Sequence, residues 1–204
     1  GEIRRRIDLV FKFRKASSAQ TTQGYASIPH KFAQRAHTNG LSIAVAKTSS
    51  ETREYLPSDV FDRRAVISDA AFALNSPSLW ELGVVSSRLH LVWIATVCGK
   101  LETRYRYSST LGWNTFPVPK LTEKNRADLT TAAENILLAR EAHFPATIAD
   151  LYDPEKMPDN LRAAHDHNDE VLERIYIGRR FRNDTERLEK LFEMYTKMTT
   201  KVGA

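Results

Sequence analysis

The chain has 204 residues, of which 42% are hydrophobic and 27% charged, with a formal net charge of +5. This composition suffices for a buried core, and because no run of 18 apolar residues occurs and residues 1–15 are rich in charge, we expect neither a transmembrane helix nor a signal peptide. Cys98 is the only cysteine, which excludes an internal disulfide and a thiolate metal site and favours a cytoplasmic protein.

Charge is distributed unevenly along the chain. Residues 1–120 hold 17 Lys and Arg against 9 Asp and Glu, whereas residues 121–204 hold 13 against 16. The basic excess of the first part is typical of a phosphate-binding surface, although chance scatter of solvated charges explains it equally well. The change falls near Pro117 and Pro119, so two domains are predicted, 1–120 and 121–204.

The first part alternates between short strands and helices. Apolar residues at helical spacing predict an amphipathic helix over 3–15, which we interpret as a linker from an upstream segment. Strands are predicted over 41–47 and 65–75, and the polar, proline-containing residues 48–61 between them predict an exposed loop. A helix is predicted over 78–98 with Gly99 at its C-terminal cap.

Residues 101–107 switch to the alternation of a strand. Four residues are predicted to lie on the side that packs against the core: Leu101, Thr103, Tyr105 and Tyr107. Glu102, Arg104 and Arg106 then project from the opposite, charged side.

Residues 121–204 are predicted to be helical throughout. Helices are expected over 121–144, with Thr122 as N-cap, and over 158–176, followed by a third helix that begins with a capping box between Asn183 and Glu186. The predicted fold class is therefore α+β, with a mixed β-sheet and packed helices followed by an all-α segment.

Catalytic and cofactor motifs are missing from the sequence. The glycines form neither a Gly-x-Gly-x-x-Gly turn nor a phosphate loop, and no serine lies in a Gly-x-Ser-x-Gly elbow. His165 and His167 are two residues apart, so on a helix they diverge, and we interpret them as a solvated polar face and not as metal ligands. Cys98 and His90 lack an orienting third group, which favours a buried cysteine over a nucleophile.

The charged face of the predicted strand is the best candidate for a binding site. Glu102 and Arg104 would project in parallel roughly 7 Å apart, where a carboxylate can accept from cytosine and a guanidinium can donate to guanine of one base pair. Lys100 and Arg106 would add phosphate contacts without sequence preference. On these residues alone, an ordinary surface ion pair between Glu102 and Arg104 is the favoured interpretation.

Longer stretches of the sequence favour nucleic-acid recognition. The stretch "LGVVSSRLHLVWIATVCGKLETRYRYSSTLGWNTFPVPKL", together with "PHKF", "SSETREYLP", "ADLYDPEKMPDNLRAAHDHNDEVLERIY" and "RLEKLFEMY", resembles the target-recognition region of the Mme-type family. These are large single-chain type II restriction and modification enzymes with adenine DNA methyltransferase activity. The resemblance extends over nearly the whole chain, with the landmarks in the family's order.

The resemblance implies a double-stranded DNA recognition module that directs an upstream methyltransferase. In that family the methyltransferase domain carries a glycine-rich S-adenosylmethionine turn and an Asn-Pro-Pro-Tyr type motif, often with a nuclease domain further upstream. Neither motif occurs in this sequence, where "NSP" at residues 75–77 lacks the aromatic residue that stacks on a flipped base. This chain is accordingly expected to bind no S-adenosylmethionine, to need no metal and to catalyse no reaction alone. A scaffold that binds another subunit is the alternative.

The resemblance also bears on individual residues. The family's recognition region includes the segment after Gly-x-Leu, which here supplies Glu102 and Arg104 where the family often has Lys and Asp. The two positions still carry opposite charges, but the acidic residue now comes first and the basic residue second. This exchange predicts that a different base pair is preferred, with cytosine facing Glu102. Weaker candidates for groove or backbone contact are Lys47, Ser49, Ser50, Arg53, Lys100, Arg106 and Ser108.

Overall fold

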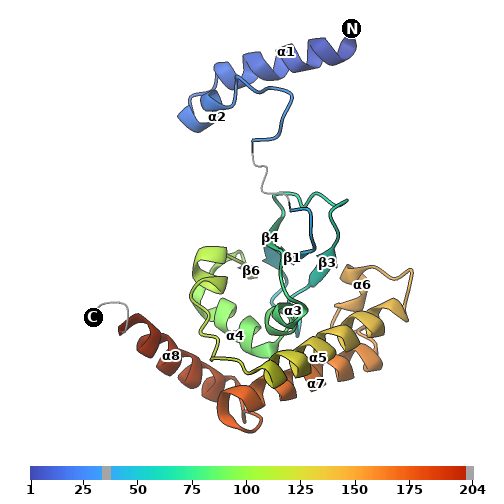
Figure 1. Ribbon diagram of the computed structural model, residues 1–204, viewed down its shortest axis with the longest axis vertical. Coiled ribbons are helices and arrows are strands. Elements are labelled where there is room, and N and C mark those ends of the chain that lie inside the picture. The colour runs from blue at the N-terminus through green and yellow to red at the C-terminus, as the bar shows by residue number, and fades with distance from the viewer. Residues whose placement is uncertain (34–37, 201–204) are drawn as a thin grey trace. The chain divides into compact units, whose positions relative to one another are not determined.

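The computed structural model describes residues 1–33 and 38–200, which belong to two compact units, residues 1–37 and 38–204 (Figure 1). The first unit holds helix α1 (Glu2–Lys15), which confirms the helix predicted at the N-terminus, and the short helix α2 (Gln20–Gly24). The Arg14 guanidinium joins them by donating to the carbonyl oxygens of Tyr25, Ile28 and Lys31 at 2.9 to 3.0 Å.

The second unit begins with a three-stranded antiparallel sheet. Strand β1 (Ser42–Ala46) lies in its centre, between β3 (Ser58–Phe61) and β4 (Ala71–Asn75). The predicted strands at 41–47 and 65–75 are confirmed, although the second begins only at Ala71. The exposed loop predicted over 48–61 is wrong, because it contains β3 and the short strand β2 (Thr48–Ser49) and buries Leu56.

Two helices follow where one was predicted. Helix α3 (Leu79–Val85) starts with a capping box between Ser78 and Glu81, and helix α4 (Arg88–Val97) starts at Ser87, whose hydroxyl accepts from the His90 N–H at 3.1 Å. The second cap is the physical reason for the break, since a serine N-cap has extended backbone and cannot continue a helix. The predicted Gly99 cap is also wrong: Cys98 is the C-cap, and Gly99 begins a strand.

A second small sheet has the order β2-β6-β5. Strand β5 (Gly99–Leu101) and strand β6 (Arg104–Arg106) form a hairpin, and β6 pairs with β2, with Thr48 opposite Arg106. A π-helical turn, η1 (Ser109–Trp113), then leads into the C-terminal helices.

The predicted helical segment is confirmed. It contains α5 (Glu123–Glu141), the short α6 (Ile148–Leu151), α7 (Asp159–Ile177) and α8 (Asp184–Thr200). Thr122 caps α5 as predicted, accepting from the Asn125 N–H at 3.1 Å. Asn183 likewise accepts from the Glu186 N–H, but the Glu186 carboxylate accepts from the Arg182 N–H, so the predicted capping box is only half formed.

The helical segment and the sheets share their cores. Ala133 of α5 packs with Ile43 of β1 and Leu82 of α3 in one cluster, and Leu172 of α7 packs with Trp93 of α4 in another. In Figure 1, α5 and α7 run side by side along one flank of the second unit, and α8 continues from their end. Residues 121–200 therefore brace the sheets of the same unit.

The solvated polar face predicted for His165 and His167 is confirmed for His167, which is exposed, and wrong for His165. His165 is fully buried, where its ring bonds the Tyr152 hydroxyl at 2.6 Å and lies 3.2 Å from the Ser86 carbonyl oxygen. Burial lowers the pKa of His165 to about 3. Asn168 is equally buried and donates to the Gly83 carbonyl oxygen at 2.8 Å. Helix α7 thus buries a polar stripe as well as an apolar one.

Candidate nucleic-acid interface

The β5–β6 hairpin places Glu102 and Arg104 at an exposed tip. Glu102 lies in a two-residue turn with a φ of 61°, and Arg104 begins the next strand. The prediction of one continuous strand, with both side chains projecting in parallel, is therefore wrong. Instead the turn brings them together: the Arg104 guanidinium donates to the Glu102 carboxylate at 2.7 Å, with the side chains 45% and 75% exposed respectively.

The turn also changes which residues face the core. Register pairs Leu101 with Arg104 and Lys100 with Tyr105, so Leu101 shares the face of Arg104. Leu101 and Thr103 are accordingly exposed, contrary to the prediction. Tyr107 is buried and Tyr105 is half-buried against the same cluster, which confirms their core role.

Positive φ at Glu102 is unusual for a residue with a side chain. A two-residue hairpin turn with positive φ at its first position normally carries glycine there, and a non-glycine residue in this region costs about 1–2 kcal/mol. The glutamate is therefore held at a position where stability alone favours glycine, a feature that clusters at functional sites.

Replacing Glu102 by glycine is expected to leave the free energy of unfolding unchanged or to raise it. Relief of about 1–2 kcal/mol of backbone strain offsets the chain entropy of glycine, about 0.5–1 kcal/mol, and the loss of an exposed ion pair, about 0–1 kcal/mol. Thr103→Gly in the same turn is the control, because Thr103 has no positive φ to relieve and should lose about 0.5–1 kcal/mol. Urea denaturation of both variants measures this, and equal losses would contradict the strain.

A groove of about 740 Å³ adjoins the hairpin. It brings together three of the weaker candidates, Lys47, Arg106 and Ser108, with Asp69, Phe72 and Leu101. The Lys47 ammonium lies 4.8 Å from the centre of the Phe72 ring, which holds this cation at the wall of the groove. The groove thus combines cationic side chains with apolar and carboxylate surface, a composition suited to base edges and phosphates.

The remaining candidates are dispersed. Lys100 is exposed on β5, and Arg53 lines a separate hollow of about 220 Å³ beside Tyr105. The Ser50 hydroxyl is hydrogen-bonded to Thr52 at 2.9 Å. Ser49 is only 3% exposed, so this structure places it in the interior and not on a surface that could meet a ligand.

Glu51 and Asp69 are members of this surface that the sequence did not single out. The Thr103 side chain hydrogen-bonds to the Glu51 carboxylate and, with Lys100 and Arg104 nearby, holds the pKa of Glu51 below its ordinary value. Glu51 is therefore a second carboxylate beside the hairpin, in addition to the Glu102 carboxylate that pairs with Arg104. Glu51 lies in the landmark "SSETREYLP", but its place beside the hairpin depends on the pairing of β2 with β6, and Asp69 reaches the groove through the connection between β3 and β4.

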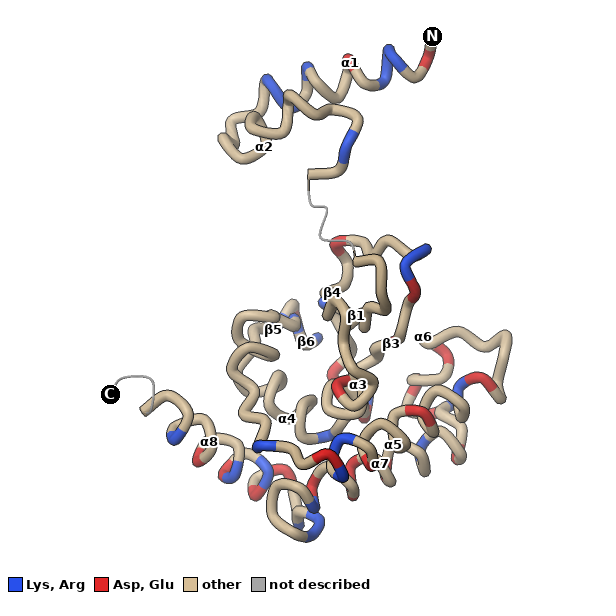
Figure 2. The backbone as a smooth tube through the Cα atoms, in the orientation of Figure 1, with Lys and Arg blue, Asp and Glu red and all other residues tan. Residues whose placement is uncertain are grey.

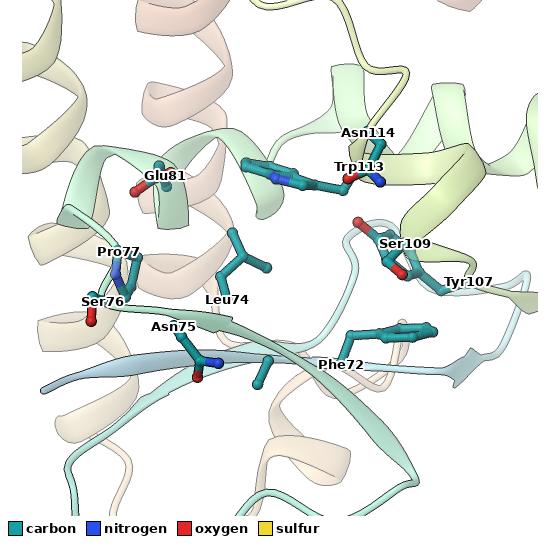
Figure 3. Close-up of a pocket in the computed structure, with 11 residues that line it drawn as sticks. Phe72, Leu74, Asn75, Ser76, Pro77, Glu81, Tyr107, Ser109, Trp113 and Asn114 are labelled. Carbon is teal, nitrogen blue, oxygen red and sulfur yellow. The ribbon is translucent and has the colours of Figure 1, made fainter. Parts of the chain in front are cut away.

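A second cavity, of about 380 Å³, lies on the other side of Phe72 and Tyr107 (Figure 3). Leu74 and Phe72 of β4 form one wall, and Trp113 of η1 lies across from them. Its one carboxylate, Glu81, already accepts from the Ser78 N–H at 2.7 Å as part of the α3 cap. The cavity is therefore a packing gap between the sheet and the helices, without a free acid or base.

The residues with catalytic potential are buried. Cys98 is 9% exposed, which confirms the prediction of a buried cysteine, and burial raises the pKa of its thiol. His90 is fully buried, its ring contacts the Tyr107 hydroxyl at 3.1 Å, and burial lowers its pKa to about 3. Within residues 1–33 and 38–200 there is no group of three His, Cys, Asp or Glu side chains that could hold a metal ion.

Comparison with known protein families agrees with this arrangement. A family model described as the MmeI target recognition domain matches residues 1–120, and one described as the MmeI C-terminal domain matches residues 121–203. The chain belongs to the MmeI family. Its first 120 residues are the target recognition domain of that family, and the hairpin with the adjoining groove lies within them.

Two relatives place the MmeI-family region within longer proteins. DNA methyltransferase A of Bacillus subtilis is 36% identical over 98% of this chain, which spans 22% of that protein's length. The solved structure of the Type IIL restriction-modification enzyme MmeI in complex with DNA is also 36% identical, with a TM-score of 0.93 over 98% of this chain and 27% of its own. This chain therefore corresponds to about a quarter of each relative. In the described part of the chain, no helix is long and apolar enough to cross a membrane.

Proposed function

We propose that the β5–β6 hairpin and its groove read the sequence of double-stranded DNA for an adenine methyltransferase in the same polypeptide. The parent protein would act in the cytoplasm as part of a restriction-modification system, with an endonuclease where it carries one. The observation that carries this proposal is the exposed Glu102–Arg104 pair on a strained turn beside a cationic groove. The 0.93 TM-score to MmeI in complex with DNA supports it.

Without DNA, Glu102 and Arg104 pair with each other, and DNA can replace this ion pair at little cost in free energy. Exposed pairs of this kind contribute about 0–1 kcal/mol, whereas one bidentate contact to the correct base discriminates by about 1–3 kcal/mol. Base contacts therefore outweigh the pair once the groove of the duplex reaches the hairpin. The carboxylate would then accept from the exocyclic amine of cytosine, and the guanidinium would donate to the O6 and N7 acceptors of guanine.

Sequence-independent contacts would come from the cations around the pair. Lys47, Lys100 and Arg106 lie within or beside the groove and are available to phosphates. Figure 2 shows mixed signs along α5, α7 and α8. These helices carry many paired charges, so we assign them the role of a brace and not of a DNA-binding surface.

Chemistry is proposed to lie outside this chain. S-adenosylmethionine would supply the methyl group in the parent protein, but the residues present here do not fit that cofactor, because the sequence has neither a glycine-rich turn nor an Asn-Pro-Pro-Tyr type motif. What this chain does is orient the duplex and select its sequence.

A selection of bound duplexes by the full-length parent protein tests the proposed function. We expect a recovered motif with one invariant C·G pair, and we expect Glu102→Ala to remove the selection at that pair alone. If the parent protein binds DNA but the recovered duplexes share no sequence motif, the proposal is overturned.

Lys100→Ala is expected to weaken binding to all duplexes alike. Removal of one phosphate contact should reduce the slope of log K against log salt by about 0.9, without a change in base preference. Titrations at several salt concentrations measure the slope. Lys124→Ala is the control, because Lys124 on α5 is also exposed but pairs with Asp128 at 2.5 Å, and the slope should stay as it was.

A further inference from the structure

The N-terminal unit exposes large apolar side chains. Ile3, Leu9 and Phe13 of α1 are 78%, 55% and 74% exposed, and Phe32 is 77% exposed. At 3.6 residues per turn, positions 3, 9 and 13 fall within about 120° of one another around the helix, an arc that they share with the ion pair of Glu2 and Arg6 at 3.0 Å. We call these three residues the α1 apolar face. A clustered apolar surface of this kind marks a binding site for another molecule.

The unit has little core with which to stabilise itself. Among its described residues, Ala26 is the only buried hydrophobic one, and Ile7 and Val10 are half-buried. The Arg14 guanidinium donates hydrogen bonds from α1 to three carbonyl oxygens of the segment after α2. A 14-residue helix is marginal in water without packing, so α1 needs a surface on which to bury its apolar face.

The other side of α1 is polar and basic. Arg4, Arg5, Lys12 and Lys15 are exposed there, and Glu2 pairs with Arg5 at 3.1 Å. Phe11 lies on this basic side and is 38% exposed, with the Lys15 ammonium 5.5 Å from the centre of its ring. One side of the helix is therefore mainly basic, and the other is apolar except for the ion pair of Glu2 and Arg6. The anionic surface of duplex DNA does not match the apolar side.

We propose that the α1 apolar face docks on the methyltransferase portion of the parent polypeptide. This inference rests on the proposed function, which places that portion in the same chain. The two relatives match 98% of this chain, but this chain covers only 22% and 27% of their lengths. Most of each relative therefore lies outside the matched region and is available as a docking partner. A partner in the same polypeptide also has a high effective concentration, which favours it over a second copy or a lipid surface.

Hydrogen exchange of the α1 amides in the full-length parent, without DNA, tests the docking. We expect these amides to exchange at least tenfold more slowly in the parent than in the 204-residue chain. Leu9→Glu with Phe13→Glu in the parent should return them to the faster rate. Lys12→Glu changes charge on the basic side and should leave the protection as it was. Phe13→Ala should give an intermediate rate even if the double variant does not fold.

Three results would overturn the docking. Protection that survives Leu9→Glu with Phe13→Glu would show that the face is not buried. If the α1 amides exchange equally slowly in the 204-residue chain and in the parent, the face is covered by residues 38–204 or by a second copy of the chain. Sedimentation distinguishes these two cases, because only the second gives a dimer. If the parent binds anionic vesicles and Leu9→Glu with Phe13→Glu abolishes this binding, the α1 apolar face is a membrane-binding surface. Base preference at the hairpin, measured on the same proteins, separates these failures from failure of DNA recognition, because none of the α1 variants alters Glu102 or Arg104.

Discussion

Replacing Arg104 by alanine in the full-length parent protein should abolish the preference for one base pair of its target. The variant loses the only forked donor at the hairpin tip, and a bidentate contact to guanine is worth about 1–3 kcal/mol, or roughly 5- to 150-fold between the correct and a wrong pair. Competition binding with duplexes that carry each of the four base pairs at that position measures the effect. Preference at all other positions should persist.

Arg64→Ala is the matched control. Arg64 also pairs with a carboxylate two residues away, with 2.6 Å between its guanidinium and Asp62, and its side chain is 85% exposed. If the Glu102–Arg104 pair reads bases, the two variants must differ, with preference unchanged in Arg64→Ala. An equal loss of affinity for every duplex in Arg104→Ala would instead make Arg104 a phosphate contact.

Exchanging the two residues gives a stricter result. In Glu102→Arg with Arg104→Glu the carboxylate and the guanidinium trade places, so the preferred base pair should change while total affinity for the best duplex remains similar. A merely structural ion pair would tolerate the exchange without any change in base preference. Selection of bound duplexes by the double variant reads out the difference.

The sequence singled out Glu102 and Arg104 as candidates but did not predict their geometry. Apolar and charged residues alternate through residues 101–107 as in a single strand. The two-residue turn breaks this alternation, so that the odd-numbered Leu101 and the even-numbered Arg104 pair and lie on the same face. The turn sequence Glu102–Thr103 has none of the Asn-Gly or Gly-x chemistry that marks such turns. The hairpin could therefore not be predicted from local sequence, and its strand β6 also pairs with β2, which lies far away in the sequence.

Helices were predictable where apolar periodicity and caps were strong. The Thr122 cap is a local feature, and both the cap and the helix that it begins, α5, are confirmed. The buried polar residues of α7 were not predictable, because their partners lie far away in sequence: Asn168 reaches Gly83, and His165 reaches Ser86. A polar residue is solvated or buried according to contacts that only the tertiary structure creates.

Glu173→Ala should be among the most destabilising single substitutions in the second unit. The Glu173 carboxylate is 1% exposed and accepts from the Arg187 guanidinium at 2.5 Å and from the Phe181 N–H at 2.9 Å. Alanine leaves the Phe181 N–H without an acceptor and leaves the largely buried Arg187 charge with the half-exposed Asp184, at 2.8 Å, as its remaining partner. We expect a loss of about 3–5 kcal/mol in the free energy of unfolding, measured by urea denaturation.

Glu170→Ala on the same helix separates burial from pairing. Glu170 also pairs with an arginine, Arg174, at 2.6 Å, but that arginine is 63% exposed, so its loss should cost about 0.3–0.5 kcal/mol. Glu173→Gln keeps an acceptor for the Phe181 N–H and should fall between the two alanine variants. Equal effects of Glu170→Ala and Glu173→Ala would mean that the junction of α7 and α8 does not depend on this buried charge. A much larger loss of stability in Glu173→Ala than in Glu170→Ala would show that the junction of α7 and α8 depends on an ion pair from which water is excluded.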